Sequence, residues 1–180
     1  MKRLQSWRRR FAHLLGTQAA LVSVMAIRYA HTNIVARDWR RLADFYVEVL
    51  GCTPVPPERD YRGAEIGKIA GLQQDPAMRL TGIHLRLPGH GENGPTLEIF
   101  EYEPAGSDFE IRSDTMGFSH IAFAVDDVRA VGAKFLENGG REVGEYVEME
   151  VAGAGHIKLH YMADPEGNIV ELQTWTPLGA

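Results

Sequence analysis

The feature of this chain that most constrains its fold is an internal repeat. The segment HTNIVARDWRRLADFYVEVLG begins at His31, and the segment HIAFAVDDVRAVGAKFLENGG begins at His120. In each segment an Asp follows the histidine by seven residues and a Gly follows it by twenty. Each copy then closes with a glutamate inside an apolar run, Glu98 in TLEIFEY and Glu171 in NIVELQTW. A duplicated unit predicts two equivalent halves, with two His and two Glu at matching places.

Hydrophobic periodicity predicts the same order of strands and helices in both halves. Alternation over 27–35 and 118–125 indicates half-buried strands, each followed by a helix. Asp38 is placed to cap the first helix, which Gly51 ends, and the second helix begins at about Asp127. The fold class is therefore α+β, with two βαβββ modules. The remaining strands are expected near 62–68, 81–87 and 95–102, and near 142–151, 155–163 and 168–175.

Composition limits the classes of partner. The 180 residues are 44% hydrophobic, enough for an ordinary globular core. Residues 1–24 carry five basic residues and no acid, so the rest of the chain holds 14 basic against 24 acidic residues, a net charge of about −10. Such a body repels nucleic acid. Cys52 is the only cysteine, so no intrachain disulfide can form, which favours a reducing, cytoplasmic location.

The first 25 residues are separate in character from the rest. Residues 1–25 form a basic and apolar tail that resembles a secretion signal or an amphipathic surface segment. The tail lacks the run of about 18 apolar residues that a membrane span needs. The plainer interpretation is a loosely attached tail or an over-long start, outside the fold. We expect one domain over 26–176, composed of module 26–105 and module 115–176.

The repeated His and Glu residues predict a metal site. Glu171 lies between apolar neighbours in a strand, and Glu98 does the same, so each carboxylate would be costly to bury without a cation. A single strand histidine is more often a hydrogen-bonded core residue, but unrelated accidents would not match His and Glu in both copies. The predicted ligands are His31, Glu98, His120 and Glu171. Imidazole and carboxylate ligands suit Zn, Ni, Co, Mn or Fe(II).

These residues carry a family resemblance. Residues 27–176, through HTNIVARDWRRLADFYVEVLG, TLEIFEY, GFSHIAFAVDD and ADPEGNIVEL, resemble the vicinal oxygen chelate superfamily. That superfamily includes glyoxalase I, methylmalonyl-CoA epimerase, extradiol dioxygenases and fosfomycin or bleomycin resistance proteins. The resemblance implies paired βαβββ modules that form a U-shaped mixed sheet around a divalent metal, with the same four ligands. It also implies a homodimer, with closure of the site by the two modules of one chain as the alternative.

The resemblance further implies a metal-dependent lyase or isomerase of the glyoxalase I-like type. A small substrate would chelate the metal through its oxygens, and Glu171 or Glu98 would remove a proton beside a metal-bound carbonyl or enediolate. One alternative is an isomerase like methylmalonyl-CoA epimerase, although such epimerases usually have Gln where Glu98 stands. Another is an enzyme like the extradiol dioxygenases, although those use three ligands. A toxin-binding or antibiotic-binding resistance protein is a further alternative. In glyoxalase I an Asn-Trp-Gly-like extension follows the glutamate that matches Glu98. That extension is absent from FEYEPAG, so the resemblance does not extend to a glutathione substrate.

Two further residues are candidates for contact with the substrate. His84 and Arg86 share one face of the strand GIHLRL. If that strand lines the binding site, these side chains could bind a carboxylate or phosphate of a small-molecule substrate. Exposure to solvent is an equal alternative.

Overall fold

The chain is an α+β protein in which each half of the repeat forms its own sheet. The computed structural model describes residues 27–107 and 111–179. The first module contains β1 (His31–Val35), α2 (Trp39–Leu50), β2 (Thr53–Arg62), α3 (Ala64–Ala70), β3 (Arg79–Arg86) and β4 (Thr96–Glu103). The second contains β5 (His120–Ala124), α4 (Val128–Glu137), β6 (Arg141–Glu142), β7 (Val147–Val151), β8 (Gly155–Ala163) and β9 (Ile169–Pro177).

The two sheets have the same topology. The first sheet has the strand order β1-β4-β3-β2, and the second has the order β5-β9-β8-β6, with β7 also paired to β8. In each sheet the first strand runs parallel to the last, and the other pairs are antiparallel. The first and last strands of a module are therefore neighbours. This pairing is what brings the histidine of each repeat beside its glutamate.

Local signals explain where the helix that follows the first strand of each module begins. The Asp38 side chain accepts a hydrogen bond from the backbone N–H of Arg41 and begins α2, and Gly51, with φ of 69°, ends it. Asp127 caps α4 in the same way through the N–H groups of Arg129 and Ala130. The cap at Asp38 and the start of the second helix at about Asp127 were predicted, and both are confirmed.

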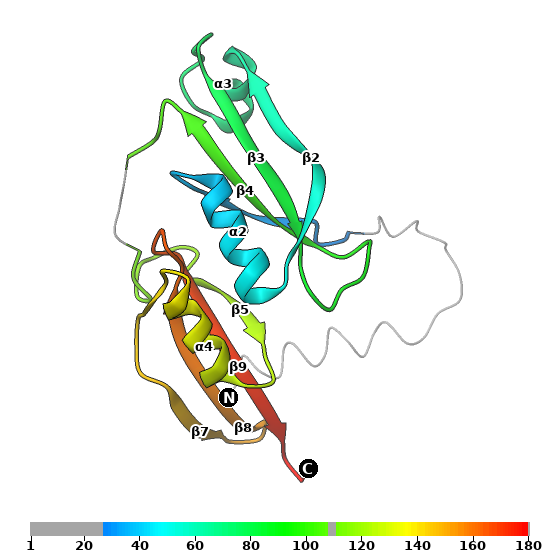
Figure 1. Cartoon of the computed structure of the whole chain (residues 1–180), viewed down its shortest axis with the longest axis vertical. Coiled ribbons are helices and arrows are strands. Elements are labelled where there is room, and N and C mark those ends of the chain that lie inside the picture. Colours follow the sequence, from blue (N-terminus) through cyan, green and yellow to red (C-terminus); the bar gives the residue numbers. More distant parts are fainter. Residues whose placement is uncertain (1–26, 108–110, 180) are drawn as a thin grey trace, which may run out of the picture.

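The helices of the two modules share one hydrophobic core. Figure 1 shows α2 and α4 as neighbours, each beside the strands of its own module. The rings of Phe45 in α2 and Phe135 in α4 meet edge to face, with centroids 5.0 Å apart. Burial of a side chain such as Leu42 contributes roughly 1.5–3 kcal/mol. We call the side of each sheet that faces its helix the helix-covered face and the opposite side the open face.

Polar contacts also join the modules. The Tyr46 hydroxyl of α2 donates a hydrogen bond of 3.0 Å to the carboxylate of Asp164, in the turn between β8 and β9. The Glu166 carboxylate of the same turn accepts hydrogen bonds from the backbone N–H groups of Arg37 and Asp38, at 2.7 and 2.9 Å. Because these groups lie at the start of α2, the second module helps to fix the first helix.

Several expected element boundaries were wrong. No strand covers 62–68: β2 ends at Arg62 and α3 follows it. The reason is that β2 is an edge strand exposed over most of its length, so its sequence TPVPPERDYR lacks apolar alternation. The first strand begins at His31 instead of residue 27, and the strand expected over 142–151 is divided into β6 and β7. The predicted tail, 1–25, lies outside the described residues.

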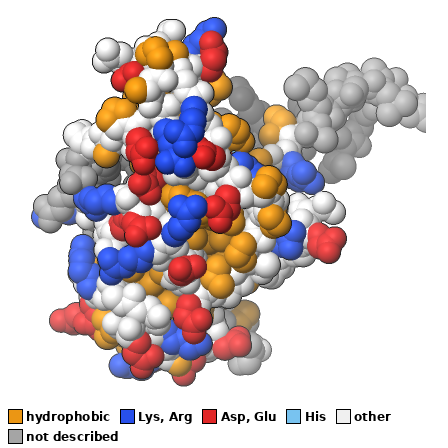
Figure 2. Space-filling model, turned by 45° about the horizontal axis from the view of Figure 1, so that its top comes forward, with side chains coloured by type: hydrophobic (Ala, Val, Ile, Leu, Met, Phe, Trp, Pro, Cys, Tyr) orange, Lys and Arg blue, Asp and Glu red, His pale blue; other side chains and the backbone are white. Residues whose placement is uncertain are grey.

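The surface is consistent with a globular body that carries charge of both signs. On the face drawn in Figure 2, acidic and basic side chains are interspersed, with apolar side chains between them. Within 27–107 and 111–179, no helix is both long and apolar enough to cross a membrane.

Candidate metal centre

Strand alternation places the polar residues of β1 and β4 on the open face of the first sheet. Ile34 of β1 and Ile99 of β4 belong to the core beside α2, so their neighbours in the strand point the other way. Two of those neighbours, Asn33 in β1 and Glu98 in β4, are directly paired in the sheet. His31 precedes Asn33 by two residues and therefore lies on the same face. The sequence pattern thus presents an imidazole and a carboxylate from adjacent strands.

The Glu98 carboxylate is the centre of this cluster. Its Oε2 atom lies 3.6 Å from Nε2 of His31 and accepts a hydrogen bond of 2.9 Å from the Asn33 amide. Its Oε1 atom lies 2.8 Å from Nε2 of His84, which comes from β3. The other ring nitrogen of His84 lies 3.0 Å from the Thr96 hydroxyl, a contact that orients the ring. Glu98 is therefore well supplied with hydrogen-bond partners.

The donor set fits a divalent metal. One possible ligand atom from each of His31, His84 and Glu98 lies within 4.8 Å of the others. The side chain of Glu98 is only 13% exposed, so its charge calls for compensation. Burial, the largest influence, lowers the pKa of His84 even though the charge of Glu98 opposes this. A lowered pKa favours the neutral imidazole, which is the form that binds metals.

A second cluster occupies the equivalent place on the open face of the second sheet. Nε2 of His120 lies 3.1 Å from the Glu171 carboxylate, whose side chain is 12% exposed. Nδ1 of His120 lies 3.2 Å from the Ser119 hydroxyl. The ring of Tyr161 packs against His120, with centroids 5.0 Å apart. Burial and then the charge of Glu171 raise the pKa of the Tyr161 hydroxyl.

The strand register shows that the two clusters are equivalent. His84 is paired with Glu98 across β3 and β4, and Tyr161 is paired with Glu171 across β8 and β9. The modules differ beside the glutamate, because Glu98 has Asn33 opposite it in β1, whereas Glu171 has Ala122 in β5. The sequence analysis did not find Asn33 or Tyr161 as partners of these glutamates. Counting register through the turn between β8 and β9 would have found Tyr161, whereas Asn33 lies on a parallel strand that no hairpin joins to β4.

The four predicted ligands are thus gathered as two pairs. His31 lies with Glu98 on one sheet, and His120 lies with Glu171 on the other. Among the described residues, the group that gathers within 4.8 Å consists of His31, His84 and Glu98, and it does not include the second pair. Convergence of all four on one ion therefore stays a prediction. Arg86 lies two residues beyond His84 in β3, on the same open face.

The single cysteine is not suited to catalysis. Cys52 is buried in the core beside α2. Burial raises the pKa of its thiol to about 11, so the reactive thiolate is scarce at neutral pH. Nucleophilic chemistry at this residue is not supported.

The comparisons with known proteins agree with the repeat and the paired sheets. The model of the Glyoxalase/Bleomycin resistance protein/Dioxygenase superfamily matches residues 28–172. The chain belongs to this superfamily. No curated protein matches the sequence of this superfamily member significantly.

Solved structures share the fold of this superfamily member. A glyoxalase family protein from Bacillus cereus aligns with a TM-score of 0.69 and 18% identity, over 87% of this chain and 99% of that one. A glyoxylase/bleomycin resistance protein/dioxygenase domain from Frankia sp. aligns with a TM-score of 0.52 and 16% identity, over 84% and 99%. A glyoxalase family protein from Enterococcus faecalis gives 0.50 and 21% identity, over 84% and 99%. At these identities the likeness is one of fold.

Proposed function

We propose that this superfamily member is a metal-dependent lyase or isomerase that acts on a small oxygen-chelating substrate by proton transfer. The observation that supports it is the equivalent pairing of a first-strand histidine with a last-strand glutamate in both sheets, at 3.6 and 3.1 Å. In this proposal His31, Glu98, His120 and Glu171 hold a divalent metal. When bound, the metal would stabilise negative charge on a substrate oxygen.

The surroundings of the two glutamates favour Glu171 as the base. The Glu98 carboxylate is held by Asn33 and His84 in addition to the contact with His31. Glu171 has Ala122 where Glu98 has Asn33, so one of the restraining hydrogen bonds has no counterpart. A carboxylate with fewer partners moves more readily toward a substrate proton. Glu171 would therefore accept the proton, and Glu98 would keep its place.

A homodimer would complete this site. Strands β1 and β5 are the edges of their sheets, and they carry one histidine of each pair. Apolar side chains lie exposed beside both pairs: Tyr29 and Val35 are 62% and 57% exposed, and Met116 and Phe118 are 97% and 101% exposed. Exposed apolar side chains around polar pairs favour coverage by a partner. We therefore expect the first sheet of one copy to face the second sheet of another, within the cytoplasm.

Solvent proton exchange tests the proposed reaction. Metal-loaded protein in D₂O is incubated with an α-hydroxy ketone, a thioester and a hemithioacetal, and deuterium uptake into each is measured by NMR. We expect exchange in at least one, and a loss of about 10²-fold or more in Glu171→Gln with the metal retained. Glu150→Gln, an exposed acid of β7, is the control and should keep full exchange. Unchanged exchange in Glu171→Gln would refute the assigned base.

A second candidate function has support from the first sheet alone. Two histidines and one carboxylate, as in His31, His84 and Glu98, are the ligand set of many Fe(II) oxygenases. A dioxygenase-like enzyme would consume O₂ with a catechol when loaded with Fe(II), and would show no dependence on Glu171. Protein that binds no metal but retains a small molecule would instead favour a binding protein of the resistance type.

A further inference from the structure

An apolar groove lies where the two modules meet. It consists of two adjoining cavities of about 530 and 410 Å³, which share Pro88, Phe123 and Ala124 in their walls. The larger cavity reaches Thr32 of β1, and the smaller one reaches the end of α2 and Ala130 of α4. Both β1 and β5 are edge strands of their sheets, so one side of each has no strand partner among the described residues. We call this groove the module seam.

The shared hydrophobic core is incompletely covered at the module seam. Among the described residues, several apolar side chains pack against this core but stay partly exposed, and six of them line the seam: Leu50, Leu87, Ile121, Phe123, Val125 and Val131. Removing such side chains from water is favourable, and a contiguous apolar surface of this kind is typical of a docking site. The seam therefore has the character of a surface that another segment covers.

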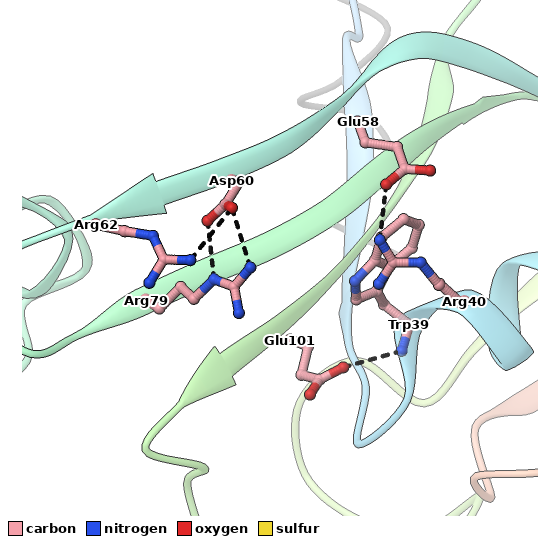
Figure 3. A network of polar contacts seen from close by, with 7 residues as sticks. All are labelled: Trp39, Arg40, Glu58, Asp60, Arg62, Arg79 and Glu101. Atoms are coloured by element: carbon pink, nitrogen blue, oxygen red, sulfur yellow. Dashed lines mark hydrogen bonds and ion pairs between the residues drawn. The ribbon is translucent and has the colours of Figure 1, made fainter.

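The other end of α2 is closed by polar contacts instead. Figure 3 shows that charged side chains of the first sheet reach the start of this helix. The guanidinium of Arg40 donates to the Glu58 carboxylate of β2 at 2.8 Å, and the backbone N–H of Trp39 donates to Glu101 of β4 at 3.3 Å. At its last residue, Leu50, the same helix lines the seam.

The first 26 residues join the fold at one end of the module seam. The carbonyl oxygen of Ala30 accepts a hydrogen bond from the backbone N–H of Thr96. This contact places 27–30 beside the end of the loop that carries Pro88, which lines the seam, and Thr32 follows in the same wall. Because β5 has five residues, the seam along it extends about 17 Å, which the fifteen residues of 11–25 can span.

The order of residues in this segment matches the order of side chains in the seam. Counting back from β1, the apolar run 11–25 comes first and the arginines at 8–10 come next. Along the seam, the apolar walls come first, and Asp126 and Asp127 follow β5 at the far end. Neither aspartate has a basic partner within the part of the chain that the structure describes, although Asp127 caps α4. Lys134 lies about two turns further along α4.

We propose that residues 8–25 of this chain dock in the module seam, with the apolar run on the partly exposed core side chains and the three arginines beside the two aspartates. A segment in this place contacts both modules and adds to the contacts between α2 and α4 that join them. The core side chains of the seam belong to the helix-covered faces, so docking leaves the open faces, with His31 and His120, accessible. The inference does not depend on the proposed function.

Paramagnetic NMR of the full chain tests this docking. A nitroxide is attached to Gln18→Cys, since the native Cys52 is buried. We expect loss of the amide signals of Val125 and Val131, whereas the amide signal of Ile69 in α3 is retained. A free segment would instead broaden the signals around residue 27 and leave those of the seam intact, which would overturn the inference.

Two labelled variants separate docking from mere proximity. Leu15→Asp in the segment and Val131→Asp in the seam should each restore the Val125 signal, because a charge would have to be buried in the apolar contact. Leu15 lies outside the described fold, so its variant gives a result even if Val131→Asp fails to fold, which circular dichroism shows. Ile69→Asp makes the same kind of change at an 87% exposed residue and should keep the signal loss.

The remaining outcomes identify other occupants and would each overturn the proposal. In a mixture of ¹⁵N-labelled wild type with unlabelled spin-labelled protein, signal loss at Val125 would mean that the segment of a second copy fills the seam. Signal loss that survives both Leu15→Asp and Val131→Asp would mean that the contact is not the apolar one described. A segment that leaves the seam intact and instead binds vesicles of anionic phospholipid would be a membrane-surface segment.

Discussion

At the scale of single residues, the surroundings of a glutamate decide whether it is fixed or can move. The repeat in the sequence indicated that His31 and Glu98 belong together, and likewise His120 and Glu171. The reason is that a histidine and a glutamate recur at the same places in both halves. The contact of His84 with Glu98 was not predicted, although His84 was a candidate for other reasons. Cross-strand register depends on the hairpin between β3 and β4, and composition does not determine where that hairpin turns.

Asp164 gives a prediction at this scale that concerns pH. Burial, the largest influence, raises the pKa of Asp164 above 3.8, although hydrogen bonds from Asn168, Tyr46 and Glu166 act in the opposite direction. Because the carboxyl binds its proton more tightly in the folded state, its contribution to the free energy of unfolding is full below the unfolded pKa and is lost as pH rises through the folded pKa. We expect the Asp164 carboxyl carbon to titrate above 3.8 in an NMR titration. A midpoint at or below 3.8 would contradict this account.

At the scale of elements, sequence patterns predicted the helices and strands that have a clear buried face and missed β2 and α3. The helices α2 and α4 carry Asp caps and apolar stripes, and β3, β4, β8 and β9 each have a strong apolar character, so all were foreseen. The strand β2 is exposed on most of its residues and α3 is a single short helix. Neither buries enough apolar surface to leave a periodic pattern, so neither was predicted.

Gly82 permits the close pairing of β3 with β4 near the cluster. A side-chain carbon at this position would collide with the carbonyl oxygen of Ile99 and with the ring of Phe100. We expect Gly82→Ala to lower the free energy of unfolding by about 1–3 kcal/mol, because the collision involves backbone. Gly144→Ala is the matched control, since an added carbon there meets nothing within 4 Å. Urea unfolding of both variants measures the difference, and equal stability would count against the described packing.

At the scale of the whole molecule, the described chain offers two half-sites, and the proposed homodimer would join a half from each copy. Modules within the chain are held together by the α2 and α4 core and by the bond between Tyr46 and Asp164. The sequence analysis anticipated equivalent modules, because duplication implies equivalent folds. It left open whether one chain closes the site, since module placement depends on contacts between distant surfaces.

Mixing two inactive variants tests the proposed exchange of half-sites. His31→Ala damages only the first sheet, and His120→Ala damages only the second. If the site forms between copies, a mixed dimer contains one intact site and one doubly damaged site. Equal mixing at random should therefore restore roughly a quarter of the wild-type proton exchange. Each variant alone should remain inactive. Absence of any recovery after subunit exchange, verified by mass spectrometry of the dimers, would place the whole site within one chain.

The central claim is that His31, Glu98, His120 and Glu171 bind one metal ion, and the affinity of the full chain for zinc tests it most directly. Equilibrium dialysis should show tight binding in the wild type, with affinity weakened by at least about tenfold in both Glu98→Gln and Glu171→Gln, since even outer partners of metal ligands are worth 10–100-fold. Glu150→Gln should match the wild type. Wild-type protein that binds no zinc, or a Glu171→Gln variant that retains full affinity, would contradict the claim.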